Sequence, residues 1–377
     1  MIKIKDKTKC CGCTACASIC PKHCISMKED KEGFLYPEAD ATLCVECGAC
    51  EKVCPVLHAG ETRKPLHCYA AKNKDEEVLK KSSSGGVFSL LAQYAIQEEH
   101  GVVFGAMWED DRVVHGAVDC VEELHKLRGS KYVQSDLRDS FIQVAENLKD
   151  GRFVLFSGTP CEIAGLKSYL RKDYDNLLTV DLACHGVPSP KVLALYIQDL
   201  KQKYGVDSLQ LNFKDKSSGW ATYSVTATNG DKVLFSERAT ENIYMKGYLH
   251  ELFSRPSCHD CAFKSFRSGS DITIADFWGI NNVFPEYNSI DGVSLVLINT
   301  EKGNRAIATV SDSAETIVVS YDDALQENGA LVYSEQAHPK RKSFFKSLSK
   351  RENVGFLITK GMEIDLLTRL KLLLKSI

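Results

Sequence analysis

Two copies of one cysteine pattern constrain this chain more than any other feature. The copies are Cys10, Cys13, Cys16 and Cys20 before Pro21, and Cys44, Cys47, Cys50 and Cys54 before Pro55. Each reads C-x2-C-x2-C-x3-C-P, so three close thiolates can bind one face of an iron–sulfide cube while the fourth reaches a neighbouring cluster. Zinc knuckles typically pair two cysteines and have no use for a third, and disulfides belong in oxidising compartments. The repeat therefore predicts two 4Fe-4S clusters.

The spacing also assigns the ligands of both clusters, because it is the ligand run of a two-cluster bacterial ferredoxin. The first cluster takes Cys10, Cys13, Cys16 and Cys54, and the second takes Cys44, Cys47, Cys50 and Cys20. We expect an α+β ferredoxin-like domain over residues 1–60. A short helix should follow each cysteine triple, with small strands between, such as residues 34–36.

Composition narrows the class of protein further. The chain has 377 residues, of which 44% are hydrophobic, so it can bury more than one core. It has no apolar run of membrane-spanning length, and its opening residues lack the apolar stretch of a signal peptide. Cluster thiolates need a reducing compartment, which predicts a cytoplasmic location. The net charge of -3 gives no general attraction to nucleic acid.

A different pattern begins after residues 60–65, which are polar and read as a linker. Apolar runs of strand length cover residues 102–107, 153–156, 177–182, 272–275 and 293–298. They alternate with helical periodicities at residues 87–97, 140–148, 162–170, 192–204 and 304–310. This alternation predicts an α/β domain with a central sheet over residues 66–335. No G-x-G-x-x-G follows these strands, so the usual nicotinamide-binding fold is not indicated.

A second set of cysteines lies in this α/β region. Cys161 follows one predicted strand and opens a helix, where free amides and the helix dipole favour a thiolate. Cys184 follows the next strand, and Cys258 and Cys261 form a C-x2-C knuckle. These four thiols are enough for a third site, which we expect to hold a third 4Fe-4S cluster; zinc and unliganded core thiols are the alternatives. Cys11, Cys24, Cys68 and Cys120 fall outside the patterns and are interpreted as free thiols.

Several motifs of this region together resemble one known family. In chain order they are Ser83-Ser84-Gly85-Gly86, Arg128-Gly129-Ser130-Lys131-Tyr132-Val133, Ser157-Gly158-Thr159-Pro160-Cys161, Cys184-His185-Gly186-Val187-Pro188, Cys258-His259-Asp260-Cys261 and residues 271–279, DITIADFWG. They resemble the β-subunit family of coenzyme F-420 hydrogenases and dehydrogenases. The N-terminal ferredoxin domain and the DFWG sequence resemble bacterial members. The resemblance implies FAD beside an iron–sulfur cluster, with Cys161, Cys184, Cys258 and Cys261 as cluster ligands.

The resemblance also places FAD near Ser84, Gly85 and Gly86. The residues support this independently, because serines and glycines before an apolar helix allow close backbone approach to a phosphate. Lys131 and Tyr132 could add charge and stacking to the flavin, although a surface lysine is equally possible. Gly158 and Thr159 offer backbone donors beside Cys161.

Three more residues are candidates for roles near the flavin, each with a structural alternative. His185 could orient a sulfur, donate a proton or satisfy a loop carbonyl. Asp276 could tune flavin protonation or cap a turn. Trp278 could stack on the isoalloxazine or pack in the core. We name Lys131, His185 and Asp276 as catalytic candidates.

The last predicted unit is a basic helical tail over residues 336–377. From His338 onward it has ten Lys or Arg and three Asp or Glu. Residues 340–342 could meet an acidic partner or an anionic membrane surface, but a solvated helix face is the simpler interpretation. Residues 364–377 place leucines at helical spacing, which suits packing on the protein or docking.

Two functions are consistent with these features. The first is a flavin- and iron–sulfur-dependent oxidoreductase that takes electrons from ferredoxin or another redox protein. It would transfer a hydride to or from an organic substrate or deazaflavin. The second is an electron-transfer adaptor for a separate catalytic subunit, with no substrate of its own and possibly serving polysaccharide biosynthesis. Bound FAD distinguishes the two.

Overall fold

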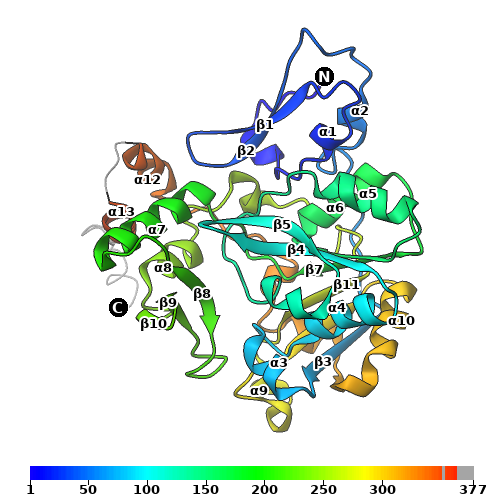
Figure 1. The fold of residues 1–377 in the computed structure, drawn as a ribbon, viewed down its shortest axis with the longest axis vertical. Coiled ribbons are helices and arrows are strands. Elements are labelled where there is room, and N and C mark those ends of the chain that lie inside the picture. Colours follow the sequence, from blue (N-terminus) through cyan, green and yellow to red (C-terminus); the bar gives the residue numbers. More distant parts are fainter. Residues whose placement is uncertain (350–352, 363–377) are drawn as a thin grey trace, which may run out of the picture.

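A small cysteine-rich domain lies at one end of a larger α/β body in the computed structural model of the protein (Figure 1). The structure describes residues 1–349 and 353–362. In the small domain a 3-10 turn, η1 (Lys7–Lys9), precedes an antiparallel hairpin of β1 (Ile25–Glu29) and β2 (Leu35–Ala39). Its two helices are α1 (Ala15–Ser18) and α2 (Ala49–Lys52). Each helix begins one residue before the third cysteine of its run, earlier than predicted.

The body is built on an eight-stranded mixed sheet, which follows a segment without regular structure at residues 59–65. The strand order is β13-β3-β12-β11-β7-β6-β4-β5. Their bounds are β3 (His67–Asn73), β4 (Val102–Glu109), β5 (Arg112–Val118), β6 (Val154–Gly158), β7 (Leu177–Leu182), β11 (Ile272–Asp276), β12 (Ser294–Ile298) and β13 (Ala314–Val318). Strands β11, β7, β6 and β4 run parallel, and the other pairs are antiparallel. All five predicted strands are confirmed, whereas β3, β5 and β13 were not predicted.

Helices cover both faces of this sheet. On one face, α4 (Val87–Gln97) and α10 (Glu301–Thr309) bury apolar side chains of β4, β6, β7 and β12. On the other, α5 (Ser140–Lys149) and α6 (Pro160–Leu170) cover the strand residues that point the opposite way. Among the shorter helices, α3 (Glu76–Lys81) follows β3, α9 (Ile280–Val283) lies between β11 and β12, and α11 (Tyr321–Leu325) follows β13. The two covered faces explain why the central strands read as continuous apolar runs.

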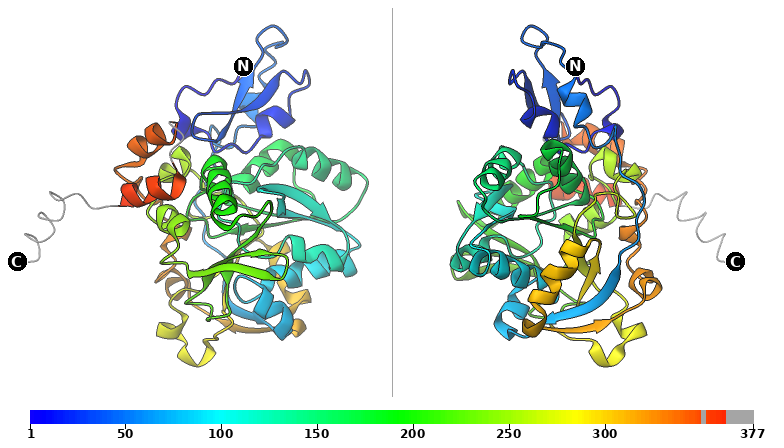
Figure 2. Two further views of the ribbon diagram at one scale, coloured as in Figure 1. Left: turned by 60° about the vertical axis from the view of Figure 1, so that its left-hand side comes forward. Right: turned by 90° about the vertical axis from the view of Figure 1, so that its right-hand side faces the viewer.

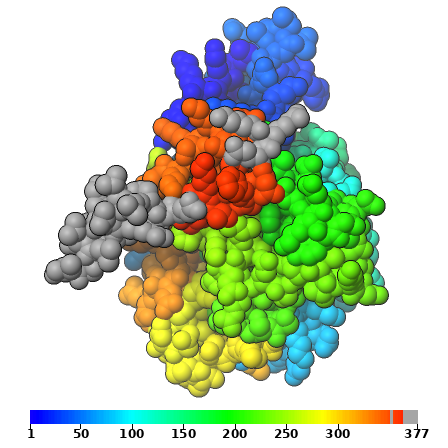
Figure 3. Space-filling model, turned by 90° about the vertical axis from the view of Figure 1, so that its left-hand side faces the viewer, coloured from blue at the N-terminus to red at the C-terminus, as the bar shows by residue number. Residues whose placement is uncertain are grey.

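A second, smaller layer packs beside the main sheet. Antiparallel strands β8 (Gln210–Asp215), β9 (Ser224–Asn229) and β10 (Lys232–Arg238) form a three-stranded sheet that was not predicted. It shares one apolar core with α7 (Pro190–Tyr204), α8 (Ile243–Leu249), α12 (Arg341–Leu348) and α13 (Val354–Met362). Figure 3 shows α12 and α13 against the surface of α7 and α8. The start of the predicted basic tail is therefore part of the body core, while residues 364–377 lie outside the described residues.

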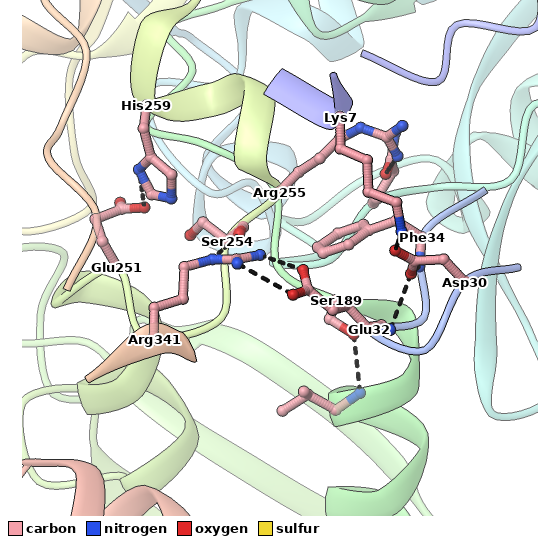
Figure 4. A network of polar contacts seen from close by, with 12 residues as sticks. Lys7, Asp30, Glu32, Phe34, Ser189, Glu251, Ser254, Arg255, His259 and Arg341 are labelled. Atoms are coloured by element: carbon pink, nitrogen blue, oxygen red, sulfur yellow. Dashed lines mark hydrogen bonds and ion pairs between the residues drawn. The ribbon is translucent and has the colours of Figure 1, made fainter. Parts of the chain in front are cut away.

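The small domain is fixed to the body by buried arginines (Figure 4). Arg341 pairs with Glu32 at 2.7 Å and donates from Nε to the carbonyl of Ser254 at 3.0 Å. The solvated-face interpretation is thus wrong for Arg341, because its acidic partner lies within the same chain. Arg255 is 0% exposed and reaches the loop of Cys10. Figure 2 shows the small domain and its descending connection along one side of the body.

Candidate functional site

The first predicted cluster set lies where the small domain meets the body. Burial raises the pKa of Cys16 to about 12, and the nearby Cys10 and Cys54 thiolates add to this effect. Cys54 therefore lies near the first cysteine triple, and the crossed ligand assignment stays a prediction. Burial also raises the pKa of Cys10, while the Arg255 charge opposes the rise. Cys10 and Cys16, which burial keeps neutral, would release protons on binding iron.

The second set lies at the outer end of the small domain. Cys47 is exposed, and the flanking Leu43 and Val45 are 55% and 58% exposed. Cys50 Sγ accepts a hydrogen bond from the backbone amide of Ile2 at 3.3 Å. Cys24, interpreted as a free thiol, has its Sγ 3.3 Å from that of Cys20, and this contact raises its pKa to about 11. The sequence pattern gave no sign of this neighbour, because Cys24 lies four residues past the run.

The third set surrounds a cavity of about 230 Å³ between the small domain and the body. Cys161, Cys184, Cys258 and Cys261 all line it, together with Cys11. They come from the start of α6, the loop after β7, and the 3-10 turn η3 (Pro256–Asp260) with the residue that ends it. Cys258 Sγ accepts from the Val187 amide at 3.4 Å. In the described part of the chain, no three His, Cys, Asp or Glu side chains form a compact mononuclear metal site.

Cys161 does not behave as the sequence predicts. A hydrogen bond that Cys161 donates to Cys11, together with burial, raises its pKa well above the ordinary value, so the helix N-terminus does not yield a ready thiolate. Thr159 starts α6 with a capping box, its Oγ1 3.3 Å from Cys161 Sγ. Glu162 completes that box by accepting from the Thr159 amide at 2.7 Å. The local sequence thus fixes the position of this thiol rather than its ionisation.

A second cavity, of about 290 Å³, lies at the carboxyl ends of β6, β7 and β11. This edge is where parallel sheets commonly bind ligands. Eight of the predicted flavin and catalytic residues line it: Ser84, Gly86, Lys131, Tyr132, Gly158, Thr159, His185 and Asp276. Gly85 and Trp278 do not. The sequence-predicted residues thus come together around one space although they span nearly 200 positions.

The two glycines before α4 have different structural reasons. A Cβ at Gly85 would lie 2.2 Å from the carbonyl oxygen of Ala71, so the backbone packs directly against β3. Gly86 is the N-cap of α4 with φ of 79°, in the left-handed region. Ser84 Oγ is already used, since it donates to the carbonyl of Val293 at 2.8 Å. Gly86 and the first turn of α4 also line the cavity, and they carry the free backbone amides of this motif.

Lys131 and Tyr132 border the cavity but have partners of their own. Lys131 Nζ donates to the carbonyls of Lys126, Leu127 and Arg128 at 3.0–3.2 Å, and burial lowers its pKa to about 7. The Tyr132 ring packs against that of Tyr248 at 5.2 Å between centroids. Lys131 therefore holds its own loop, and its charge is not directed freely at a ligand.

His185 and Asp276 are each next to a buried partner. His185 Nε2 lies 2.8 Å from Glu251 Oε1, without the alignment of a hydrogen bond. Asp276 forms an ion pair with Lys214 and accepts from Trp220 Nε1 at 2.9 Å. Trp278 lies outside the cavity with its ring stacked on Trp220, at 4.8 Å between centroids. Asp276 thus caps no turn, and its charge is compensated.

Sequence reasoning did not single out two polar residues of this cavity, Arg128 and His115. Arg128 is half-buried and donates from Nε to Ser89 Oγ at 3.0 Å, beside the start of α4. His115 is buried, with Nδ1 2.7 Å from Ser135 Oγ and Nε2 3.0 Å from the Ser157 carbonyl. Arg128 stands in a motif that was recognised as a whole, whereas His115, in an unpredicted strand, had no signal.

One segment separates the two cavities. Residues 182–187, which include Cys184 and His185, line both. A group held by the third cysteine set would therefore lie directly across this wall from a ligand in the second cavity. None of the described helices has the length and apolar character needed to cross a bilayer.

Comparison with family models agrees with this geometry. Residues 68–140 match the N-terminal part and residues 151–324 the C-terminal part of the coenzyme F420 hydrogenase/dehydrogenase beta subunit, and residues 9–57 match a 4Fe-4S dicluster domain. The chain belongs to the F420 hydrogenase/dehydrogenase beta-subunit family. As a member of this family with a dicluster domain, it is an iron–sulfur electron-transfer protein.

The chain is also similar to solved structures. One of them is a chain of the F420-reducing [NiFe] hydrogenase complex from Methanosarcina barkeri, 21% identical, with a TM-score of 0.46. The similarity covers 80% of this chain and 91% of that one. A comparison with curated protein sequences gives no match.

Proposed function

We propose that this protein is an iron–sulfur flavoprotein oxidoreductase. Electrons would pass between a redox protein and a cavity for FAD by way of three 4Fe-4S clusters. The observation that carries the proposal is the shared wall of residues 182–187, which lines both the cavity of the third cysteine set and the second cavity. A one-electron carrier and a two-electron carrier would be next to each other there.

The order of the clusters follows from where the cysteine sets lie. The second set is at the outer end, where the exposed Cys47 and the apolar Leu43 and Val45 suit contact with an electron-transfer protein. The first set faces the body, and its neighbour Cys11 already lines the cavity of the third set. Electrons would therefore enter at the second cluster and reach the third through the first.

The residues of the second cavity suit a dinucleotide. The first turn of α4 supplies backbone amides and the positive end of a helix dipole at Gly86, which favours a pyrophosphate. Arg128 lies beside that turn, and among the described residues no carboxylate forms an ion pair with it. Tyr132 and Tyr248 line the same cavity and give it an aromatic surface. FAD, when bound, would supply the change from one-electron transfer to hydride transfer.

The titratable side chains near the shared wall have defined tasks in this proposal. Glu251 Oε1 lies 2.8 Å from His185 Nε2 and would form an ion pair with the protonated imidazole. Lys214 forms an ion pair with Asp276 and holds its carboxylate in place. His185 is thus the residue best placed to exchange a proton at the cavity wall, while Asp276 contributes a fixed charge. The hydride donor or acceptor is an organic substrate or a deazaflavin.

Anaerobic purification tests the proposal. We expect about twelve iron and twelve acid-labile sulfide per chain, with one FAD. Roughly eight iron with one zinc would show that the third site is not a cluster. Full iron content without any FAD, even after incubation with the flavin, would reject the flavoprotein and support an electron-transfer adaptor. A screen of F420, NADH and ferredoxin as reductants would then identify the redox partners.

A further inference from the structure

Arg255 is a buried cation at the junction of the two parts of the chain. Its side chain is 0% exposed, the largest of the fully buried side chains. Its backbone amide donates to the Val187 carbonyl at 2.9 Å, and its own carbonyl accepts from the Cys258 amide at 3.0 Å. The residue therefore belongs to the segment that carries one half of the third cysteine set, and it lines that cavity.

The guanidinium of Arg255 is directed to the first cysteine set. Nε donates to the Cys10 carbonyl at 2.9 Å, Nη2 donates to the Leu35 carbonyl at 2.9 Å and lies 3.8 Å from Cys10 Sγ, and Nη1 donates to Gln134 Oε1 at 2.8 Å. The rings of Phe34 and Tyr36 pack on it at 5.3 and 4.4 Å. Phe34 and Arg255 lie next to each other in Figure 4.

The guanidinium of Arg255 lies close to the backbone of Gly12, where a side chain would clash with it. Gly12, between Cys11 and Cys13, has φ of 75°, and a Cβ there would lie 2.8 Å from Arg255 Nη1. Glycine is therefore favoured at this position for two reasons: the backbone is left-handed, and the arginine lies too close for a Cβ. Gln134 supports the same loop from its other end, because its Nε2 donates to the Cys11 carbonyl at 3.0 Å. Arg255 is thus held in one position by hydrogen bonds and by the rings packed on it.

The charge of Arg255 has no carboxylate to balance it. All four contacts of its guanidinium are to neutral carbonyl oxygens and one sulfur, and among the described residues it forms no ion pair. The neighbouring Arg341 is different, because Glu32 compensates it at 2.7 Å. A buried charge without a counter-ion is strongly unfavourable. The group that balances Arg255 must therefore lie at the cysteines that it contacts.

We propose that Arg255 is a positioning residue that supplies a fixed positive charge to the first cluster and makes that cluster easier to reduce. The inference rests on the proposed ligand set of Cys10, Cys13, Cys16 and Cys54. Each electron that enters makes the cluster one charge more negative, and no proton or bond change is needed at Arg255. A nearby buried cation and hydrogen bonds at the ligand sulfur favour the more negative state and so raise the reduction potential.

The placement of Arg255 gives this charge a function in electron transfer. It lies between the first and third cysteine sets, so it stabilises an electron at the body side of the small domain. An electron from the exposed second cluster would then pass inward, toward the α/β body, rather than remain near the surface.

Redox titration of the holoprotein, followed by EPR, tests the proposal in Arg255→Gln and Arg255→Lys. In Arg255→Gln we expect the reduction equilibrium constant of one cluster to fall at least tenfold, about 59 mV for a one-electron couple. Should the variant instead lose that cluster, iron per chain would fall by about one third, which also shows that the cluster needs the charge. Arg255→Lys should keep the iron and most of the potential.

A matched control removes the other buried arginine contact. The double variant Glu32→Gln/Arg341→Gln deletes a charge pair of the same junction without changing its net charge, and should leave all potentials in place. Unchanged potentials and iron in Arg255→Gln would overturn the proposal. It would also be overturned by equal effects of Arg255→Lys and Arg255→Gln, or of the double variant, since packing would then be the cause. Wild-type iron and flavin contents test the proposed function separately.

Discussion

Replacing Arg128 with methionine tests the flavin cavity most directly. Arg128 lies beside the first turn of α4, and its Nε donates to Ser89 Oγ of that turn at 3.0 Å. It lines the cavity together with Gly86. A hydrogen bond to a charged group contributes about 1.5–3 kcal/mol, which corresponds to about 10- to 150-fold in affinity. Because the side chain is only half-buried, water screens part of its charge. We therefore expect about a tenfold loss of FAD affinity.

The assay is fluorescence titration of the flavin-free protein with FAD, together with iron per chain. Arg138→Met is the matched control, because Arg138 is exposed, pairs with Glu109 at 2.9 Å and does not line the cavity. Both variants should keep their iron, and the control should bind FAD as the wild type does. An Arg128→Met affinity within twofold of the wild type would refute a pyrophosphate at this position. Loss of iron as well as flavin in Arg128→Met alone would show that the side chain serves folding instead.

Two further predictions concern the third cysteine set and Lys131. Replacing Cys258 and Cys261 with serine should remove about four of twelve iron and leave the spectra of the N-terminal clusters unchanged. The double variant Cys68→Ser/Cys120→Ser, outside every set, should keep all iron; equal iron in both variants would contradict the ligand assignment. Lys131 loses its proton near pH 7 in the folded chain but near pH 10.5 when unfolded. The unfolded state therefore binds more protons between these values, and stability rises with pH through that window. Lys131→Met should show a smaller rise in its urea midpoint from pH 7 to pH 9.5, and an unchanged rise would contradict the burial of this ammonium.

Local patterns in the sequence were sufficient for much of the fold. The five predicted strands lie in the central sheet, and the five predicted helices cover residues within three positions of their observed bounds. These elements are long and buried, so their apolar periodicity is strong. The strands of the small sheet were missed. The strands β8, β9 and β10 share one apolar core with α12 and α13, which come from the far end of the chain. Contacts between segments so distant in the sequence leave no local pattern.

The cysteine spacing by itself determined that the chain carries clusters. A cluster needs several thiolates from one short loop, so its ligands lie close together in the sequence. Tertiary structure decided what surrounds them. Only the fold brings Arg255 to Cys10 across 245 positions, or places residues 182–187 between two cavities. The tertiary structure also gives the two adjacent glycines different surroundings, since Gly86 lines the cavity and Gly85 packs on β3. Ligand spacing is a property of one loop, whereas burial, charge balance and neighbouring cavities depend on how distant segments pack.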